Sequence, residues 1–268
     1  MTSKPYLIRI SSQKGGVGKT TVAVNLGVAL AMSQYKVLVV DSDMSNPSVG
    51  FHLGLEDVNI GTEDVIRKKV SLKKAVVVHA PSSLSVLPGT LTTRSYIPSA
   101  STLTEFFAML ANESYDFIII DTAPGLLQPE TLSKDLSGYV SEALIITTPE
   151  LSACTSSIRL AKEFDKVSIR HSLAINRFRN RNYEISPREI NELYGNPAIG
   201  MIPEDETVPI SVAQHIPAYL LNSKSKFAIA IGDTASMYVS KAGLIPKIPG
   251  RSNKKGGIFR RIWNFFFG

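Results

Sequence analysis

The stretch YLIRISSQKGGVGKTTVAVNLGVAL, residues 6–30, decides the fold of this chain. A short apolar run opens it, a loop with glycines at 15, 16 and 18 follows, and an apolar segment of helical length closes it. When such a loop lies between a strand and a helix, its backbone N–H groups point into a concavity that can bind phosphate. The positive end of the helix dipole adds to this attraction. The stretch therefore predicts an α/β fold with a phosphate-binding loop.

Two side chains of this loop have predicted roles beside the backbone. Lys19 would reach the β- and γ-phosphates of a nucleotide, and the Thr20 hydroxyl would bind Mg²⁺. A glycine-rich turn without a ligand is the alternative, but G-K-T-T between a strand and a helix favours the nucleotide. The general pattern has glycine five positions before Gly18, where this chain has Gln13. The predicted nucleotide-binding residues of the loop are Lys14, Gly15, Gly16, Val17, Gly18, Lys19, Thr20 and Thr21.

Along the rest of the chain, short apolar runs alternate with segments of helical length. Several runs are apolar throughout, as expected of parallel strands that are covered on both faces. We therefore predict one domain over residues 1–243, an α/β fold with a mostly parallel sheet flanked by helices. The predicted strands are 6–11, 36–41, 74–80, 84–88, 117–121, 142–148, 172–176 and 198–203, and the longer helices are 19–34, 100–114, 151–166 and 224–242.

The composition is that of a globular protein, since 44% of the 268 residues are hydrophobic and 19% are charged. A single cysteine, Cys154, excludes a disulfide framework and any cysteine-ligated metal or cluster within one chain, and it fits a reducing cytoplasm. No run approaches the roughly 20 apolar residues of a membrane span, and the first residues lack the apolar core of a signal peptide. The sequence predicts a cytoplasmic protein that is not integral to a membrane.

The positive charge is concentrated near the C-terminal end of the sequence. The formal net charge is +6, and the seven cations after Asp233 are not accompanied by any acidic residue, so residues 1–233 carry −1. Non-specific binding to DNA needs many cations on one face. The near-neutral body therefore disfavours nucleic acid as a partner.

Residues 258–268 have the pattern of an amphipathic helix that lies on a membrane surface. At about 100° per residue the apolar side chains fall on one face, and Arg260, Arg261 and Asn264 fall on the other. A flexible linker predicted over 244–257, with Lys254 and Lys255, favours anionic lipid as the partner, while a helix docked on the body is the alternative. The predicted membrane-binding residues are Ile258, Phe259, Arg260, Arg261, Ile262, Trp263, Phe265, Phe266 and Phe267.

Three aspartates stand at the ends of predicted strands. Asp41 and Asp43 end the run KVLVVD and the turn after it, and Asp121 ends the run FIIID. The carboxyl ends of parallel strands meet at the ligand edge of an α/β sheet, so we expect these carboxylates beside the phosphate loop. Turn-forming acids after a buried strand, or a structural cap at Asp121, are the alternatives.

KGGVGKTT, residues 14–21, resembles the deviant Walker A motif of the MinD/ParA family of dimerising P-loop ATPases, and the chain looks closest to the MinD-type site-determining members. The resemblance covers most of the sequence, in matching order and spacing. The further similar segments are VVDSDMSNPSVGFHLGL (39–55), FIIIDTAPG (117–125), ITTPELS (146–152), INR (175–177) and IPEDETV (202–208).

The resemblance implies ATP and Mg²⁺ as cofactors and an ATP-dependent homodimer with three catalytic residues. Lys14 would cross to the phosphates of the partner subunit, Lys19 would bind the phosphates of its own subunit, and Asp43 would position the attacking water. The resemblance also implies a metal site and a base site. The implied metal residues are Thr20, Asp41 and Asp121, the last through a water, and the implied adenine contacts are Asn176, Pro203 and Asp205.

By this resemblance the chain is a slow, MinD-like ATP hydrolase. It would dimerise with ATP, associate reversibly with the inner face of the cell membrane, and position a regulatory or cargo protein at the division site or a similar place. A ParA-like ATPase that segregates DNA or cargo is one alternative, which Gln13 favours, and a MinD relative that positions flagella or another organelle is a second. A cluster-carrying relative is disfavoured by the single cysteine, and a non-enzymatic scaffold by the complete set of site residues.

Overall fold

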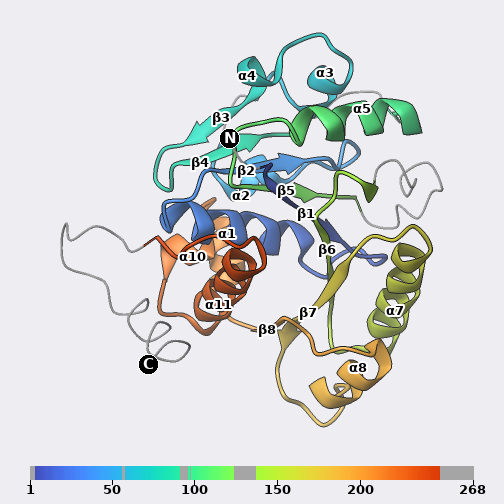
Figure 1. Cartoon of the computed structure of the whole chain (residues 1–268). Helices are drawn as coiled ribbons and strands as arrows, with labels where there is room; N and C mark the ends of the chain where they lie inside the picture. Colours follow the sequence, from blue (N-terminus) through green and yellow to red (C-terminus); the bar gives the residue numbers. More distant parts are fainter. Residues whose placement is uncertain (1–3, 56–57, 91–95, 97, 124–136, 248–268) are drawn as a thin grey trace.

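A mostly parallel β-sheet runs through the centre of the computed structural model, which describes residues 4–55, 58–90, 96, 98–123 and 137–247 (Figure 1). Within these residues the sheet has eight strands in the order β3-β4-β2-β5-β1-β6-β7-β8, and only β3 is antiparallel to its neighbour. The strands are β1 (Tyr6–Ser11), β2 (Val37–Asp41), β3 (Val77–His79), β4 (Leu84–Leu87), β5 (Phe117–Asp121), β6 (Glu142–Thr147), β7 (His171–Phe178) and β8 (Gly200–Pro203). This confirms the predicted fold class.

Helices cover both faces of the sheet (Figure 1), which explains why several of the central strands are almost entirely apolar. In β5, for example, Phe117 and Ile119 join one core, while Ile118 and Ile120 join the other. One layer holds α1 (Lys19–Met32), α2 (Val49–His52), α9 (Thr207–Ala213), α10 (Ala218–Leu221) and α11 (Lys226–Lys241). The other layer holds α3 (Thr62–Ile66), α4 (Leu72–Ala75), α5 (Ala100–Leu110), α7 (Leu151–Lys166) and α8 (Pro187–Tyr194).

The strand predicted over 74–80 is partly wrong. Its first residues belong to α4, and only Val77–His79 form a strand, at the edge of the sheet. Leu72 and Ala75 are buried in the core beneath α3 and α5, which stabilises one helical turn there. Val78 is 62% exposed, so the apolar run does not mark a strand covered on both faces. Packing against other elements decides here between a helical turn and a strand. The local sequence carries no information about that packing.

Helix α1 lies between the sheet and α11, so residues around most of its circumference are buried. Gly27 is a point of close approach to the sheet, because a Cβ atom there would lie 2.5 Å from Cγ2 of Val39 on β2. The absence of a side chain at Gly27 lets α1 pack against β2. The same packing holds the N-terminus of α1, and the loop that precedes it, at the ends of the parallel strands.

We expect Gly27→Ala to lower the free energy of unfolding by about 1–3 kcal/mol, because the new methyl group must displace the packed Val39 side chain. Gly232→Ala in α11 is the matched control. Its Cβ would meet only Tyr219, at 3.7 Å, so this variant should gain about 0.5–1 kcal/mol from reduced freedom of the unfolded chain. Urea unfolding followed by circular dichroism measures both changes. Equal changes in the two variants would contradict the packing argument.

The last described residues contact the body at the edge of the sheet where β2 and β5 begin. The Tyr35 hydroxyl donates to the Ile245 carbonyl at 2.9 Å and accepts from the Lys247 N–H at 3.2 Å. The Lys247 ammonium lies over the Tyr35 ring and pairs with Asp116 at 3.0 Å. The start of the predicted linker is therefore held to the body as far as Lys247.

Residues 248–257 of the predicted linker and the predicted amphipathic segment 258–268 lie outside the described residues. Among the helices that the structure does describe, none combines the length and the apolar character needed to cross a bilayer.

Candidate functional site

The loop between β1 and α1 has the backbone of an anion-binding concavity. Gly16 and Gly18 have φ angles of 75° and 92°, in the left-handed region that favours glycine. Gly18 is followed directly by Lys19, the first residue of α1, so the loop ends at a helix N-terminus. Successive N–H groups in such a turn converge on one side and bind phosphate together with the helix dipole. The loop thus has the geometry that a polyphosphate requires.

The two loop lysines lie in different surroundings. Lys19 is only 7% exposed, and burial lowers its pKa while the Asp121 and Asp43 carboxylates act in the opposite direction. Its ammonium is therefore held in the interior, close to negative charge. The Lys14 ammonium instead donates to the Ser152 hydroxyl in the first turn of α7.

The carboxylate of Asp121 lies against the Thr20 hydroxyl. Asp121 is the register partner of Asp41, so both strands end side by side, as the sequence predicts. Thr20 Oγ1 donates to Asp121 Oδ2 at 2.6 Å, and Ser48 Oγ donates to Thr20 Oγ1 at 3.0 Å. Asp121 Oδ1 is buried without a hydrogen-bond partner among the described residues. Burial, and then the charge of Asp41, raise the pKa of Asp121 to about 7.

The other two aspartates hold the turn after β2. Asp41 accepts from the N–H groups of residues 48 and 49 at 2.9 and 3.0 Å, and from the Asp43 N–H at 3.1 Å. Burial raises the pKa of Asp41 to about 6 in spite of these bonds. Asp43 Oδ1 accepts from the backbone and the hydroxyl of Ser45 and from the backbone of Asn46. Asp41 thereby fixes a turn that places Asp43 at the same edge of the sheet as the loop.

These oxygen donors fit Mg²⁺ beside a phosphate. In the part of the chain that the structure describes, no three histidine, cysteine, aspartate or glutamate side chains gather into a metal site. Instead, the Thr20 hydroxyl lies against the Asp121 carboxylate, whose second oxygen has no partner among the described residues. Mg²⁺ takes oxygen ligands and usually keeps several waters beside one or two protein groups and phosphate oxygens. The donors present therefore suit a magnesium ion that arrives with a nucleotide.

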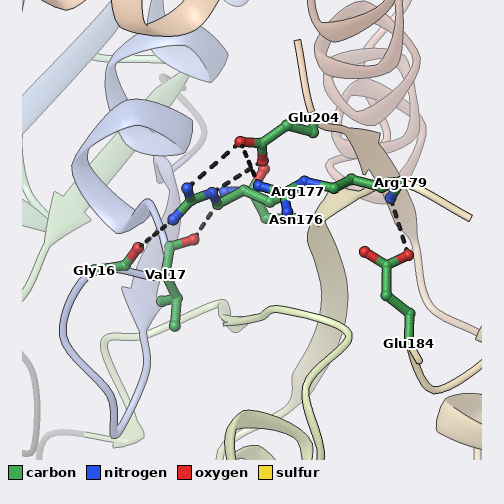
Figure 2. A network of polar contacts seen from close by, with 7 residues as sticks. All are labelled: Gly16, Val17, Asn176, Arg177, Arg179, Glu184 and Glu204. Carbon is green, nitrogen blue, oxygen red and sulfur yellow. Dashed lines mark hydrogen bonds and ion pairs between the residues drawn. The ribbon is translucent and has the colours of Figure 1, made fainter. Parts of the chain in front are cut away.

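The residues predicted to contact adenine already have partners within the chain. Asn176 is 4% exposed, and its amide donates to the Val17 carbonyl of the loop at 2.8 Å (Figure 2). Asp205 accepts from the N–H groups of Thr207 at 2.8 Å and Phe227 at 3.2 Å, at the starts of α9 and α11. Burial opposes the charge of Asp205, but hydrogen bonds from Thr207, Phe227 and Lys226 together outweigh it and lower the pKa. Adenine contact at Asn176, Pro203 and Asp205 stays a prediction.

Three contacts of this site were not predicted from the sequence. Ser48 contacts Thr20, Ser152 contacts Lys14, and Arg177 contacts the Gly16 carbonyl. These partners are separated by 28, 138 and 161 residues, so no local spacing connects them. Ser48 and Ser152 lie within segments that resemble the family, but the sequence of those segments does not predict which residues they contact.

Comparison with known proteins gives the family. A family model described as an AAA domain matches residues 6–175. The septum site-determining protein MinD of Synechocystis sp. is 31% identical over 240 residues, which cover 85% of this chain and 87% of that protein. The chain belongs to the MinD/ParA family of P-loop ATPases. The predicted resemblance is thereby confirmed.

Solved structures of family members share the fold of this chain. The septum site-determining protein MinD of Pyrococcus horikoshii, complexed with Mg-ADP, has a TM-score of 0.80 and 30% identity, and the match covers 89% of this chain and 98% of that one. A chain of the MinC:MinD cell division protein complex of Aquifex aeolicus has a TM-score of 0.77 and 26% identity, covering 92% of this chain and 99% of that one. The family fold therefore extends over nearly all of the described residues.

Because the Thr20 hydroxyl lies against Asp121, we expect Thr20→Val to weaken ADP binding about tenfold or more in Mg²⁺ and to change it less than about twofold in EDTA. Thr20→Ser keeps the hydroxyl and is the matched control, which should bind ADP as the natural chain does. Isothermal titration calorimetry measures the affinity of the natural chain and of both variants in Mg²⁺ and in EDTA. An equal loss for Thr20→Val in EDTA would show that the hydroxyl does not serve the metal.

Proposed function

We propose that this chain is a MinD-type ATPase switch, which binds Mg-ATP, pairs with a second copy, hydrolyses ATP slowly and associates with a membrane surface while paired. One observation carries the proposal. The glycine concavity, the buried Lys19 and the Thr20–Asp121 pair lie together where the parallel strands end. The MinD of Pyrococcus horikoshii, complexed with Mg-ADP, supports a magnesium nucleotide as the ligand here.

Each group at this edge would act on a different part of the nucleotide. Loop N–H groups and Lys19 would bind the β- and γ-phosphates. Thr20 would hold Mg²⁺ directly and Asp121 would hold it through a water, while Asp41 would fix the turn beside them. The bound ion would neutralise charge on the phosphate oxygens. Asp43 would orient the water that attacks the γ-phosphate.

Lys14 is the residue through which pairing would control hydrolysis. Within one chain its ammonium donates to the Ser152 hydroxyl on α7. In the pair that we propose, it would exchange this hydroxyl for the phosphates of the partner subunit. A cation at that position stabilises the charge that develops on the transferred phosphoryl group. A single chain would then lack one catalytic residue, and its hydrolysis would be slow.

Asp43→Asn should trap the ATP-bound pair, because the amide keeps an acceptor for Ser45 and Asn46 but no longer orients the attacking water as a carboxylate does. We expect kcat to fall about 100-fold or more while the affinity for ATP changes little. Light scattering after gel filtration in ATP should find a persistent dimer. Asp116→Asn, at the opposite edge of the sheet, is the control and should turn over normally. Normal turnover by Asp43→Asn would remove Asp43 from the mechanism.

The predicted segment over 258–268 would supply the membrane contact. A segment of about ten residues does not hold a helix alone in water, so it would order only on lipid and bind weakly. Two segments on one pair gain effective concentration, by about 10²- to 10⁴-fold. ATP would thus control membrane residence, and hydrolysis would release the chains. We place the paired state at the inner face of the cell membrane and the single chain in the cytoplasm.

Deletion of residues 256–268 should leave ATP binding unchanged and abolish ATP-dependent sedimentation with vesicles that contain anionic lipid. A matched variant, Arg260→Glu with Arg261→Glu, keeps the apolar face and should lose most of the binding, since each cation near such a surface contributes on the order of 1 kcal/mol. Sedimentation should be compared in ADP, ATP and a non-hydrolysable analogue. Undiminished sedimentation of the deleted chain would disprove the role of the tail.

The partner of the switch would be a protein. MinD of Aquifex aeolicus occurs in a MinC:MinD cell division complex, and MinD of Synechocystis sp. is a septum site-determining protein. We therefore propose that the paired chain recruits a regulatory or cargo protein at the division site or a similar place. The net charge of −1 over residues 1–233 argues against DNA as the cargo surface.

A further inference from the structure

Strand β7 ends in an irregular turn that redirects Arg177. Ile175 pairs with Met201 and Phe178 with Pro203, so β7 has one more residue than β8 between these two pairs. Arg177 occupies this bulge with a φ of 60°, a conformation that costs a residue other than glycine about 1–2 kcal/mol. Such strain persists only where surrounding contacts hold it. The contacts of the Arg177 side chain therefore indicate what the bulge is for.

Arg177 connects Glu204 with the phosphate loop (Figure 2). Its Nε and Nη2 donate to the two carboxylate oxygens of Glu204 at 3.0 and 3.4 Å, and its Nη1 donates to the Gly16 carbonyl at 3.4 Å. The neighbouring Asn176 donates to the Val17 carbonyl at 2.8 Å. Two successive carbonyls of the loop are thus held from the β7 side.

Holding these carbonyls orients the N–H groups of the loop. In a planar trans peptide the C=O and the N–H point in opposite directions. The Gly16 carbonyl shares its peptide with the Val17 N–H, and the Val17 carbonyl shares its peptide with the Gly18 N–H. Hydrogen bonds from β7 to the two carbonyls therefore turn both N–H groups away from β7. Donors that are oriented before the anion arrives bind it without the cost of reorganisation.

Glu204 is the residue that aligns Arg177. Burial opposes its charge, but hydrogen bonds from Arg177 and Arg179 outweigh this and lower the pKa of Glu204, so it is ionised at neutral pH. The side chain of Arg177 is 49% exposed, and an ion pair at that exposure adds little to stability by itself. The planar fork of an arginine on a carboxylate does fix direction. This leaves the third nitrogen of Arg177 aimed at the loop.

Arg179 offers an internal comparison. It also donates to Glu204, at 3.2 Å, and its side chain is 45% exposed, close to the value for Arg177. Its backbone N–H donates to Glu184 at 3.1 Å (Figure 2), and its side chain also hydrogen-bonds with Tyr183. The two arginines thus have similar charge and exposure and share a carboxylate. Of their described contacts, only that of Arg177 reaches the loop.

We propose that Arg177, aligned by Glu204, is a positioning residue that orients the phosphate loop and sets its affinity for the polyphosphate of the nucleotide rather than for the base. The inference rests on the nucleotide binding that we propose above. Removing the hydrogen bond from the arginine to the loop should weaken phosphate binding about tenfold, as expected for one bond with a charged donor. A base contact would instead affect only ligands that carry the base.

The test uses the full chain and two probes, ATP and tripolyphosphate, which lacks the base. Titration calorimetry should find both bound about tenfold more weakly by Arg177→Ala and without change by Arg179→Ala. Arg177→Lys, which keeps a charged donor but not the fork on Glu204, should recover part of the affinity. Loss of ATP affinity with tripolyphosphate unaffected, or equal effects of the two alanine variants, would overturn the inference.

Hydrogen exchange tests the orientation of the loop directly, in the absence of any ligand. Amide hydrogen exchange of a peptide that covers the loop should be faster in Arg177→Ala than in the natural chain, and unchanged in Arg179→Ala. Unchanged exchange in Arg177→Ala would contradict the orienting role. Failure of the natural chain to bind ATP would refute the proposed function itself. Equal ATP binding by the natural chain and Arg177→Ala would refute only the role of Arg177.

Discussion

The parallel pairing of β1 with β5 and β6 is the constraint on which the rest of the structure depends. It buries β1 on both sides in the middle of the sheet, so the loop that follows it must leave at the edge where the parallel strands end. On its other side β5 pairs with β2, and this second parallel pairing sets Asp121 beside Asp41 at that edge. The parallel order β2-β5-β1 therefore brings together a loop of N–H donors and two buried carboxylates. A nucleotide site in an open α/β sheet needs this juxtaposition, and neither element provides it alone.

Charged side chains are buried at the edge of the sheet that holds the phosphate loop. Asp41 and Asp121 are each 1% exposed, and burial raises the pKa of both, whereas burial lowers the pKa of Lys19 beside them. Hydrogen bonds to Asp41 and from Thr20 to Asp121 offset part of this cost. A divalent cation and a polyphosphate would add opposite charges to such a site together. In the function that we propose, this arrangement would favour joint binding of metal and nucleotide over binding of either alone.

The phosphate loop and the last described residues of the chain lie at opposite edges of the sheet. The loop and the aspartates lie where β2 and β5 end, while Tyr35, Asp116 and Lys247 meet where the same strands begin. A five-residue strand spans roughly 17 Å, so Lys247 lies about that far from the edge of the sheet that holds the phosphate loop. The body thus holds Ile245 and Lys247 at the edge of the sheet opposite the phosphate loop.

The sequence by itself predicted the fold class from the alternation of apolar runs with helical segments, and it predicted the phosphate loop, the strand-end positions of the aspartates and the family from contiguous motifs. Tertiary structure alone decided that residues 72–75 form a turn of helix before a short edge strand, since burial beneath distant helices made that choice. It also decided that Asn176 and Arg177 contact the loop across 159 and 161 residues. These contacts form because the bulge in β7 directs side chains toward a loop that is close only in the folded sheet. No local sequence pattern predicts a contact of this kind.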